Sequence, residues 1–483
     1  MNLHLVVLAA YSVGLILFGV WIGRSVRESK DFFVAGRALS PTLIFATVMA
    51  ANIGAGTTVG AASLGYRFGL SAWWWVGSAG IGTFFLAFLV GPRIYRLASE
   101  RGFYTVGDFL EHRYGANVRA VMTAFLWVGA PAILASQLMV LAIVMEVVAG
   151  VPRLPGLLLG GVVTTTYFTA GGLRGAAWIN LVQLVVLAIG FVLAVSLAVA
   201  GVGGWGGVAS RASEIGPDYL NFWNSSGAGW TLLALLVPNF IVSPGLLQKI
   251  YGARDARAIR LGVGVCAAVL LVFAFAPAVL GMVARFHHPD LLNPDDALPV
   301  LLKTNLPLIV GAIGLGALFM ADVSSADAIL FMLATSMSRD LYHRFINPGA
   351  SDQRILAVAR GAAVAGGVVA VALAIVFESV IGPLKLFYSL MALSLFVPVI
   401  AGLYTRRGGA PEVFASVAAG IAVMLAVRVG TANAGFGFLT PNLAGLIAAA
   451  IGFAGVAVAR GGGGGGGDRG RAGMAGASLR QTE

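Results

Sequence analysis

Two aspartates and a pair of serines lie close together in the stretch ADVSSADAILFMLATSMSRDLY, residues 321–342, directly after the apolar run LIVGAIGLGALFM, residues 308–320. Hydroxyl and carboxylate oxygens, together with free backbone carbonyls, are the ligands that hard cations prefer. At the centre of a lipid bilayer each aspartate costs roughly 2.5 to 3.5 kcal/mol on an insertion scale, so a purely structural helix gains nothing from it. The stretch therefore predicts part of a cation site.

The oxygen-bearing residues of this stretch spread over one broad helix face. At about 100° per residue, Ser324 and Ser325 lie with Ala321 at the centre of that face. Asp322 and Asp327 lie to its two sides. Two hydroxyls and one carbonyl are too few ligands for a cation, so a second segment must supply the rest.

The segment ATVMAANIGAGTTVGAASLGY, residues 46–66, is the candidate for that second contribution. It places Asn52, Gly54 and Thr57 in the middle of an apolar stretch, and each glycine costs a helix interior about 1 kcal/mol, which favours local unwinding. Unwound main chain at membrane depth is tolerated where it is buried or lines a cavity, and its carbonyls can bind a cation. Close helix packing through the small residues is the alternative.

The composition indicates an all-α integral membrane protein. Of the 483 residues 59% are hydrophobic and 11% are charged, and the mean hydropathy is +0.91. Apolar runs of about 18 to 25 residues recur, each long enough to cross about 30 Å of hydrocarbon as a helix. The net charge of +11 does not indicate nucleic-acid binding, because the basic residues are scattered over short loops. The single cysteine, Cys266, leaves no disulfide within one chain.

We expect about 13 transmembrane helices, followed by a flexible glycine-rich cytoplasmic tail at residues 461–483. The basic residues of the first span follow it, which predicts a retained helix with the N-terminus outside and the C-terminus in the cytoplasm. The approximate bounds of the expected spans are 3–23, 41–66, 70–96, 119–149, 153–171, 177–202, 229–250, 261–285, 306–340, 355–378, 383–404, 410–429 and 441–460.

The sequence offers no place for enzyme chemistry. It contains no P-loop, no Rossmann glycine fingerprint and no HExxH, and its five histidines fall in loops or at the ends of spans. The segments outside the expected spans are short, so a soluble catalytic domain is not predicted. An ion or solute channel remains as an alternative of another class.

Five motifs carry a resemblance to a known family, and they occur in the family's order over nearly the whole chain. The chain resembles the sodium/solute symporters, which include sodium-coupled sugar, proline, sialic acid, iodide and monocarboxylate transporters. The motifs are DFFVAGRALSP (31–41), AANIGAGTTVG (50–60), YTVGDFLEHRYG (104–115), GGLRGAAWINLVQ (171–183) and ADVSSADAILFMLATSMSRDLY (321–342).

The resemblance implies a LeuT-type fold with two inverted five-helix repeats. The implied parts are a leading helix at 3–23, repeats at 41–202 and 229–404, and extra helices at 410–460. In this family the coupling Na⁺ is held by carbonyls of the first core helix and by a carbonyl and hydroxyls of the eighth. Carried over to matching positions, the sodium ligands are Ala50, Ile53, Ala321, Ser324 and Ser325.

The implied function is sodium-coupled import of a small polar organic solute by alternating access, in the plasma (inner) membrane. Val76 stands where sugar-transporting relatives have a glutamate, which argues against hexoses. No catalytic residue is expected, and the oligomeric state is not predicted. The residues expected to bind the solute are Asn52, Gly54, Thr57, Val76, Ser243 and Gln248.

The chain departs from the family at one charged position. Many relatives read WTDV where this chain reads WINL, so Asn180 replaces an acidic residue that helps to hold a second cation. We hypothesise that this charge has moved to Asp327, which would bind a second cation or accept a proton. The alternative function is then a proton-coupled or dual-cation symporter of the same fold. In the competing interpretation, nearby donors neutralise Asp322 and Asp327, which only brace the helices.

Overall fold

A computed structural model describes residues 6, 13–14, 34–225 and 229–461, without the side chains of residues 167–179. The predicted leading helix at 3–23 lies outside these residues except at three positions, and so does the predicted tail beyond Gly461. The predicted repeats at 41–202 and 229–404 and the extra helices at 410–460 lie within them.

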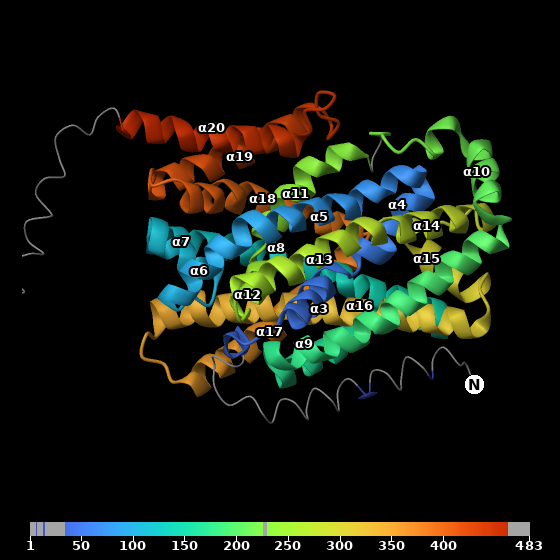
Figure 1. Ribbon diagram of the computed structural model, residues 1–483, viewed down its shortest axis with the longest axis horizontal. Helices are drawn as coiled ribbons and strands as arrows, with labels where there is room; N and C mark the ends of the chain where they lie inside the picture. Colours follow the sequence, from blue (N-terminus) through green and yellow to red (C-terminus); the bar gives the residue numbers. More distant parts are fainter. Residues whose placement is uncertain (1–5, 7–12, 15–33, 226–228, 462–483) are drawn as a thin grey trace, which may run out of the picture.

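The described part of the chain contains helices and no strand, and most helices run along the long axis of the molecule (Figure 1). Three π-helical segments are η2 (Gly56–Gly60), η4 (Leu86–Val90) and η8 (Ser336–Ile346), and five short 3₁₀ segments are η1 (Ala35–Arg37), η3 (Gly69–Ala72), η5 (Pro217–Tyr219), η6 (Trp230–Leu232) and η7 (Pro294–Asp296). The α-helices are α3 (Pro41–Asn52), α4 (Ala61–Phe68), α5 (Trp73–Phe85), α6 (Gly91–Arg101), α7 (Val106–Tyr114), α8 (Ala116–Ala149), α9 (Arg153–Gly201), α10 (Gly204–Ile215), α11 (Leu233–Val242), α12 (Pro244–Tyr251), α13 (Ala256–Phe273), α14 (Phe275–His287), α15 (Ala297–Thr304), α16 (Leu308–Thr335), α17 (Asp352–Val376), α18 (Ile381–Tyr404), α19 (Ala410–Gly430) and α20 (Pro441–Gly461).

Ten helical segments within the described residues are long and apolar enough to cross a membrane. The protein is therefore an integral membrane protein, as its composition predicts. The predicted spans and the helices agree to within a few residues along most of the chain. The spans expected at 153–171 and 177–202 instead form one continuous helix, α9. The count of 13 stays a prediction.

The first core helix is interrupted, which confirms the unwinding expected from its glycines. Helix α3 ends at Asn52, and Ile53 is extended with φ −100° and ψ 104°. Helical structure resumes only in η2. Gly54 lies inside the break, where an added Cβ would overlap Ser325 Oγ and Gln137 Oε1. A side chain at position 54 would therefore push the two neighbouring helices away from the break.

A second interruption separates α11 from α12. Ser243 has φ −51° and ψ 120°, and Pro244 is the first residue of α12. Proline has no backbone N–H and favours the first helical position, so it allows a new helix to begin at this point. This break was not predicted. Each of the two predicted repeats thus begins with a broken helix, an arrangement found in many inverted-repeat transporters.

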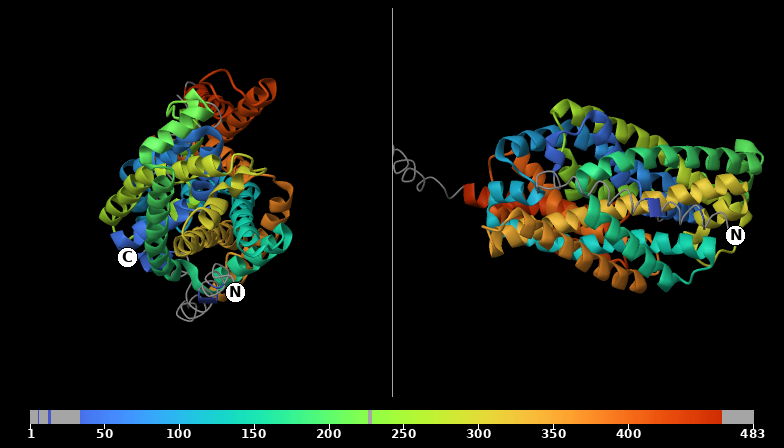
Figure 2. Two further views of the ribbon diagram at one scale, coloured as in Figure 1. Left: turned by 90° about the vertical axis from the view of Figure 1, so that its right-hand side faces the viewer. Right: turned by 90° about the horizontal axis from the view of Figure 1, so that it is seen from below.

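Helix α16 lies in contact with both broken helices. It packs against α3, α12, α8 and α9, so the stretch 321–327 faces other helices and not lipid. Helices α19 and α20 form an edge layer that packs mainly against itself and against α18 (Figures 1 and 2). The broken helices and α16 therefore form the interior in which a transport site can be built.

A cluster of ionised side chains joins α7, the start of α8 and η8. Arg119 forms ion pairs with Asp108, Glu111 and Asp340 at 2.7, 2.8 and 2.6 Å. Thr105, the N-cap of α7, also donates to Asp340 Oδ1 at 2.6 Å. We call these five residues the Arg119 cluster. It fixes one end of the helix bundle through charge-assisted hydrogen bonds.

The pH dependence of stability is expected to report on Glu111. Burial raises its pKa, but the guanidinium groups of Arg344 and Arg119 outweigh this and hold the pKa below the usual 4.5. A depressed folded-state pKa stabilises the fold above pH 4.5, and this contribution is lost as pH falls through the lower folded value. We expect Glu111→Gln to lower the thermal midpoint at neutral pH, and the difference from wild type to vanish in acid. A difference in thermal midpoint between Glu111→Gln and the wild type that does not depend on pH would show that ionisation of Glu111 is not its cause.

Candidate cation and solute site

The hydroxyl of Ser325 reaches from α16 into the break after α3. Its Oγ lies 2.9 Å from the carbonyl oxygen of Ala50 and 2.8 Å from that of Ile53. A serine hydroxyl has one proton, so it can donate to only one of these carbonyls at a time. The second carbonyl oxygen thus retains free acceptor capacity in a buried position.

Both carbonyls are available because the break redirects their usual donors. In an unbroken helix the N–H groups of Gly54 and Thr57 would bond to the carbonyls of Ala50 and Ile53. Here Gly54 N donates to Thr57 Oγ1 at 2.9 Å, and Thr57 N donates to Gly54 O at 3.0 Å. The broken segment satisfies its own donors and leaves two carbonyls directed at α16.

The remaining predicted sodium ligands lie on the same stretch of α16. Ser324 Oγ donates to the carbonyl oxygen of Ala321 at 3.0 Å. All five predicted ligand residues are 5% exposed or less. Their oxygens suit a hard alkali cation. In residues 34–225 and 229–461 no cluster of three or more His, Cys, Asp or Glu side chains offers a different metal site.

Alanine at position 54 is expected to weaken sodium binding. Its Cβ would overlap Ser325 Oγ and Gln137 Oε1, so the hydroxyl would move away from the freed carbonyls. Overpacking of this kind costs about 1 to 3 kcal/mol, which corresponds to roughly 5- to 150-fold in affinity. A sodium titration of the thermal midpoint measures the change.

Gly361→Ala in α17 is the matched control, because an added Cβ there would meet nothing within 4 Å. We expect this variant to bind sodium as the wild type does. Equal sodium affinity in Gly54→Ala and in the control would show that the geometry of the break does not affect cation binding.

A small cavity of about 50 Å³ lies between the two helix breaks. Helices α3, α8, α11, α12, α16 and α18 contribute to its wall. Its lining residues are Ala51, Asn52, Ile133, Asn239, Phe240, Ser243, Gly245, Leu246, Ala328, Ile329, Met332, Phe387 and Tyr388. No ionised side chain is among them, and the volume holds no more than one or two water molecules.

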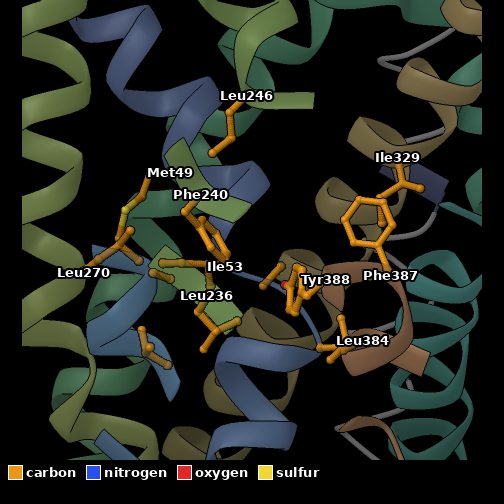
Figure 3. Close-up of a cluster of buried hydrophobic side chains, with 14 of the residues drawn as sticks. Met49, Ile53, Leu236, Phe240, Leu246, Leu270, Ile329, Leu384, Phe387 and Tyr388 are labelled. Carbon is orange, nitrogen blue, oxygen red and sulfur yellow. The ribbon is translucent and has the colours of Figure 1, made fainter. Parts of the chain in front are cut away.

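The polar groups in the cavity wall are few. Asn52 Nδ2 donates to Val48 O at 2.9 Å, whereas its buried Oδ1 has no hydrogen-bond partner. Phe240, Phe387 and Tyr388 bring aromatic rings to the same region from α11 and α18 (Figure 3). Such a wall suits a small solute held by a few hydrogen bonds and by aromatic contact.

The structure separates the predicted solute residues into three groups. Asn52 and Ser243 line the cavity. Gly54 and Thr57 hold the break through the hydrogen bond between them. The other two predicted residues, Val76 and Gln248, are buried but do not line the cavity, and Gln248 Oε1 has no hydrogen-bond partner. Contact of these residues with a solute stays a prediction.

Three important residues were not predicted. Gln137 on α8 accepts a hydrogen bond from Ala55 N at 2.8 Å and so supports the break. Asn239 in α11 donates to Tyr388 O at 3.0 Å beside the cavity. Lys249 in α12 is 3% exposed. Each is a polar residue inside an apolar span, which is the signal that identified residues 321–327.

The two aspartates of α16 have different surroundings. Asp322 is fully buried, and neither carboxylate oxygen has a hydrogen-bond partner. The interpretation in which nearby donors neutralise both aspartates is therefore wrong for Asp322. Asp327 is 9% exposed, and Asn180 on α9 is 4% exposed. The transfer of a charge from position 180 to position 327 stays a hypothesis.

Known sequences similar to this chain are membrane transporters. Residues 32–420 match the model of the sodium:solute symporter family. A sodium/glucose cotransporter of Vibrio parahaemolyticus is 25% identical over 76% of this chain and 74% of its own length. The high-affinity proline transporter PutP of Bacillus subtilis is 23% identical over 74% of this chain and 78% of its own length.

Solved structures with a similar fold are transporters too. A Na⁺-coupled sialic acid symporter in a substrate-bound, outward-open state aligns with a TM-score of 0.81 and 18% identity, over 95% of this chain and 98% of that chain. Mhp1, a nucleobase-cation-symport-1 family transporter in a closed conformation, aligns with a TM-score of 0.59 and 16% identity, over 87% and 92% of the two chains. At these identities the structures support the fold alone.

Proposed function

This chain belongs to the sodium:solute symporter family and is a sodium-coupled symporter, and we propose that its sodium ion binds between the break in α3 and the serine pair of α16. The ligands are the five predicted residues: the carbonyls of Ala50, Ile53 and Ala321 and the hydroxyls of Ser324 and Ser325. The observation that carries this proposal is the reach of Ser325 Oγ to two carbonyls freed by the break. Sodium is here a transported substrate.

The site couples ion and solute because both use the same few residues. Asn52 lines the solute cavity and lies between the two carbonyl ligands, Ala50 and Ile53. Any change that sodium makes in this segment therefore moves a group that faces the solute. Such coupling is reciprocal, so each ligand raises the affinity for the other. Exposure of the cavity to alternate sides of the membrane then gives symport.

The solute that this wall suits is small, polar and organic, since the wall carries amide, hydroxyl and aromatic groups but no ionised side chain. We place the N-terminus outside and the C-terminus in the cytoplasm of a plasma (inner) membrane, because most of the 31 Lys and Arg residues then lie on cytoplasmic loops.

The test is a thermal-shift screen of the purified protein. Amino acids, carboxylates, sugars and ureas are each added in sodium chloride and in potassium chloride at equal ionic strength. We expect one class to raise the thermal midpoint in sodium and not in potassium, because a ligand stabilises the state that binds it. Equal midpoints with and without sodium in every class would overturn sodium coupling. In liposomes, saturable counterflow of the same solute distinguishes a carrier from a channel.

A further inference from the structure

A second, larger cavity of about 440 Å³ lies beside the Arg119 cluster and shares no lining residue with the solute cavity. Its wall comes from the end of α6, from α7, from the start of α8 and from η8. A volume of this size is in the range of small-molecule sites. The lining residues are Arg101, Gly102, Phe103, Tyr104, Asp108, Glu111, His112, Arg119, Arg339, His343 and Arg344.

The two carboxylates in this wall are already neutralised by neighbouring donors. Asp108 accepts a hydrogen bond from Tyr104 N at 2.7 Å and pairs with Arg119 at 2.7 Å. Glu111 pairs with Arg119 at 2.8 Å and with Arg344 at 2.7 Å. These contacts fix the wall in place, and they leave the carboxylates without need of a further cation.

The other guanidinium groups give the cavity an excess of positive charge. Arg101 is the last residue of α6 and forms no ion pair within the part of the chain that the structure describes. The guanidinium of Arg339 lies over the ring of Tyr104, 4.3 Å from its centroid, which holds this charge at the wall. Four arginines of the wall thus stand against its two carboxylates and a third one, Asp340, which pairs with Arg119. One positive charge is left over.

We propose that this cavity binds an anionic phosphate group, with Arg101 and Arg339 as its main cationic contacts. A guanidinium presents its N–H groups in a planar fork that matches two phosphate oxygens. The rings of His112 and His343 lie in the same wall and can donate further hydrogen bonds. This site goes beyond the proposed sodium site and does not depend on it.

The position of the cavity along the spans limits the source of the phosphate group. Arg101 is the last residue of the apolar segment Gly56–Arg101, and η8 closes the segment Leu308–Ile346. The cavity therefore lies at the end of the spans, at the depth of lipid headgroups, and on the cytoplasmic side in the proposed topology. Basic pockets between helices on this side bind anionic headgroups. A lipid phosphodiester and a soluble phosphate share the chemistry that the wall recognises.

Thermal-midpoint titrations of the purified full-length protein test the site and identify the source. One arm compares sodium phosphate with sodium chloride at equal sodium concentration, and the other compares micelles that contain phosphatidylglycerol with micelles that contain phosphatidylcholine. We expect a saturable rise of the wild-type midpoint in at least one arm, because a ligand stabilises the state that binds it. A response to phosphatidylglycerol alone identifies a lipid headgroup, and a response to inorganic phosphate alone identifies a soluble anion.

Arg101→Gln and Arg339→Gln are expected to weaken this binding by roughly 10-fold each, since each removes hydrogen bonds to a charged group. Arg428→Gln, which removes an exposed arginine in the last turn of α19, is the matched control and should respond as the wild type does. Arg101 is exposed, so its variant decides the question even if Arg339→Gln does not fold.

Two results would overturn the phosphate site. One is the absence of a saturable shift in both arms. The other is the same shift in the wild type, Arg101→Gln and Arg428→Gln, because a general effect of salt or lipid on stability acts on all three alike. The difference in midpoint between sodium and potassium is measured separately, so failure of the phosphate site leaves the proposed function standing.

Discussion

Alanine at both Ser324 and Ser325 is expected to abolish the sodium-specific stabilisation of the protein and, with it, sodium-driven uptake. The double change removes two of the five proposed oxygen ligands and the contact between α16 and the break. Hydrogen bonds to charged groups contribute about 1.5 to 3 kcal/mol each, and we take this as the order of magnitude for each oxygen ligand. The two losses together lower sodium affinity by more than about 100-fold.

The measurement is the thermal midpoint in sodium chloride against potassium chloride, followed by uptake of whichever solute the screen identifies. Ser338→Ala is the matched control: Ser338 is a buried serine of η8 that follows α16 directly, and its Oγ bonds to Thr335 O at 3.4 Å. We expect it to keep the full sodium response. Uptake that keeps its complete dependence on the sodium gradient in the double variant would show that the ion binds elsewhere.

Methionine at Arg119 is expected to destabilise the fold strongly. Arg119 pairs with three carboxylates, and one of them, Asp340, is 3% exposed. Removal of one partner from a buried ion pair costs about 3 to 5 kcal/mol, because the other charge is left unpaired. The readout is the thermal midpoint and the fraction of monodisperse protein in detergent.

The matched control for this change is Arg254→Met. Arg254 pairs with Asp255 at 3.3 Å, and the two side chains are 54% and 48% exposed. Exposed pairs contribute about 0 to 1 kcal/mol, so this variant should resemble the wild type. Arg119→Met combined with Asp340→Asn should recover part of the lost stability, because the double variant no longer contains the unpaired buried carboxylate of Asp340. Equal losses in Arg119→Met and Arg254→Met would show that burial does not decide the effect.

Much of the fold follows from patterns that the sequence displays openly. Apolar runs of membrane length locate the spans, because the bilayer core sets the length of a helix. The glycines at 54 and 56 locate the first break, and the serine pair at 324–325 lies opposite it, as expected. These signals are local in the chain, so a single sequence reveals them.

The remaining features depend on contacts between distant segments. The break at Ser243 has only a proline as its signal, and proline in membrane helices is often accommodated without a break. Gln137 and Lys249 are visible as polar residues, but their partners Ala55 and Thr47 lie far away in the sequence. The continuous α9 cannot be read from hydropathy, because hydropathy does not show whether two apolar runs join.

The proposed sodium site at the break in α3 also sets the energetics of accumulation. Each sodium ion that crosses the membrane with a neutral solute carries one elementary charge. One elementary charge gains about 2.3 kcal/mol per 100 mV, which corresponds to about a 50-fold concentration ratio before the sodium gradient is added.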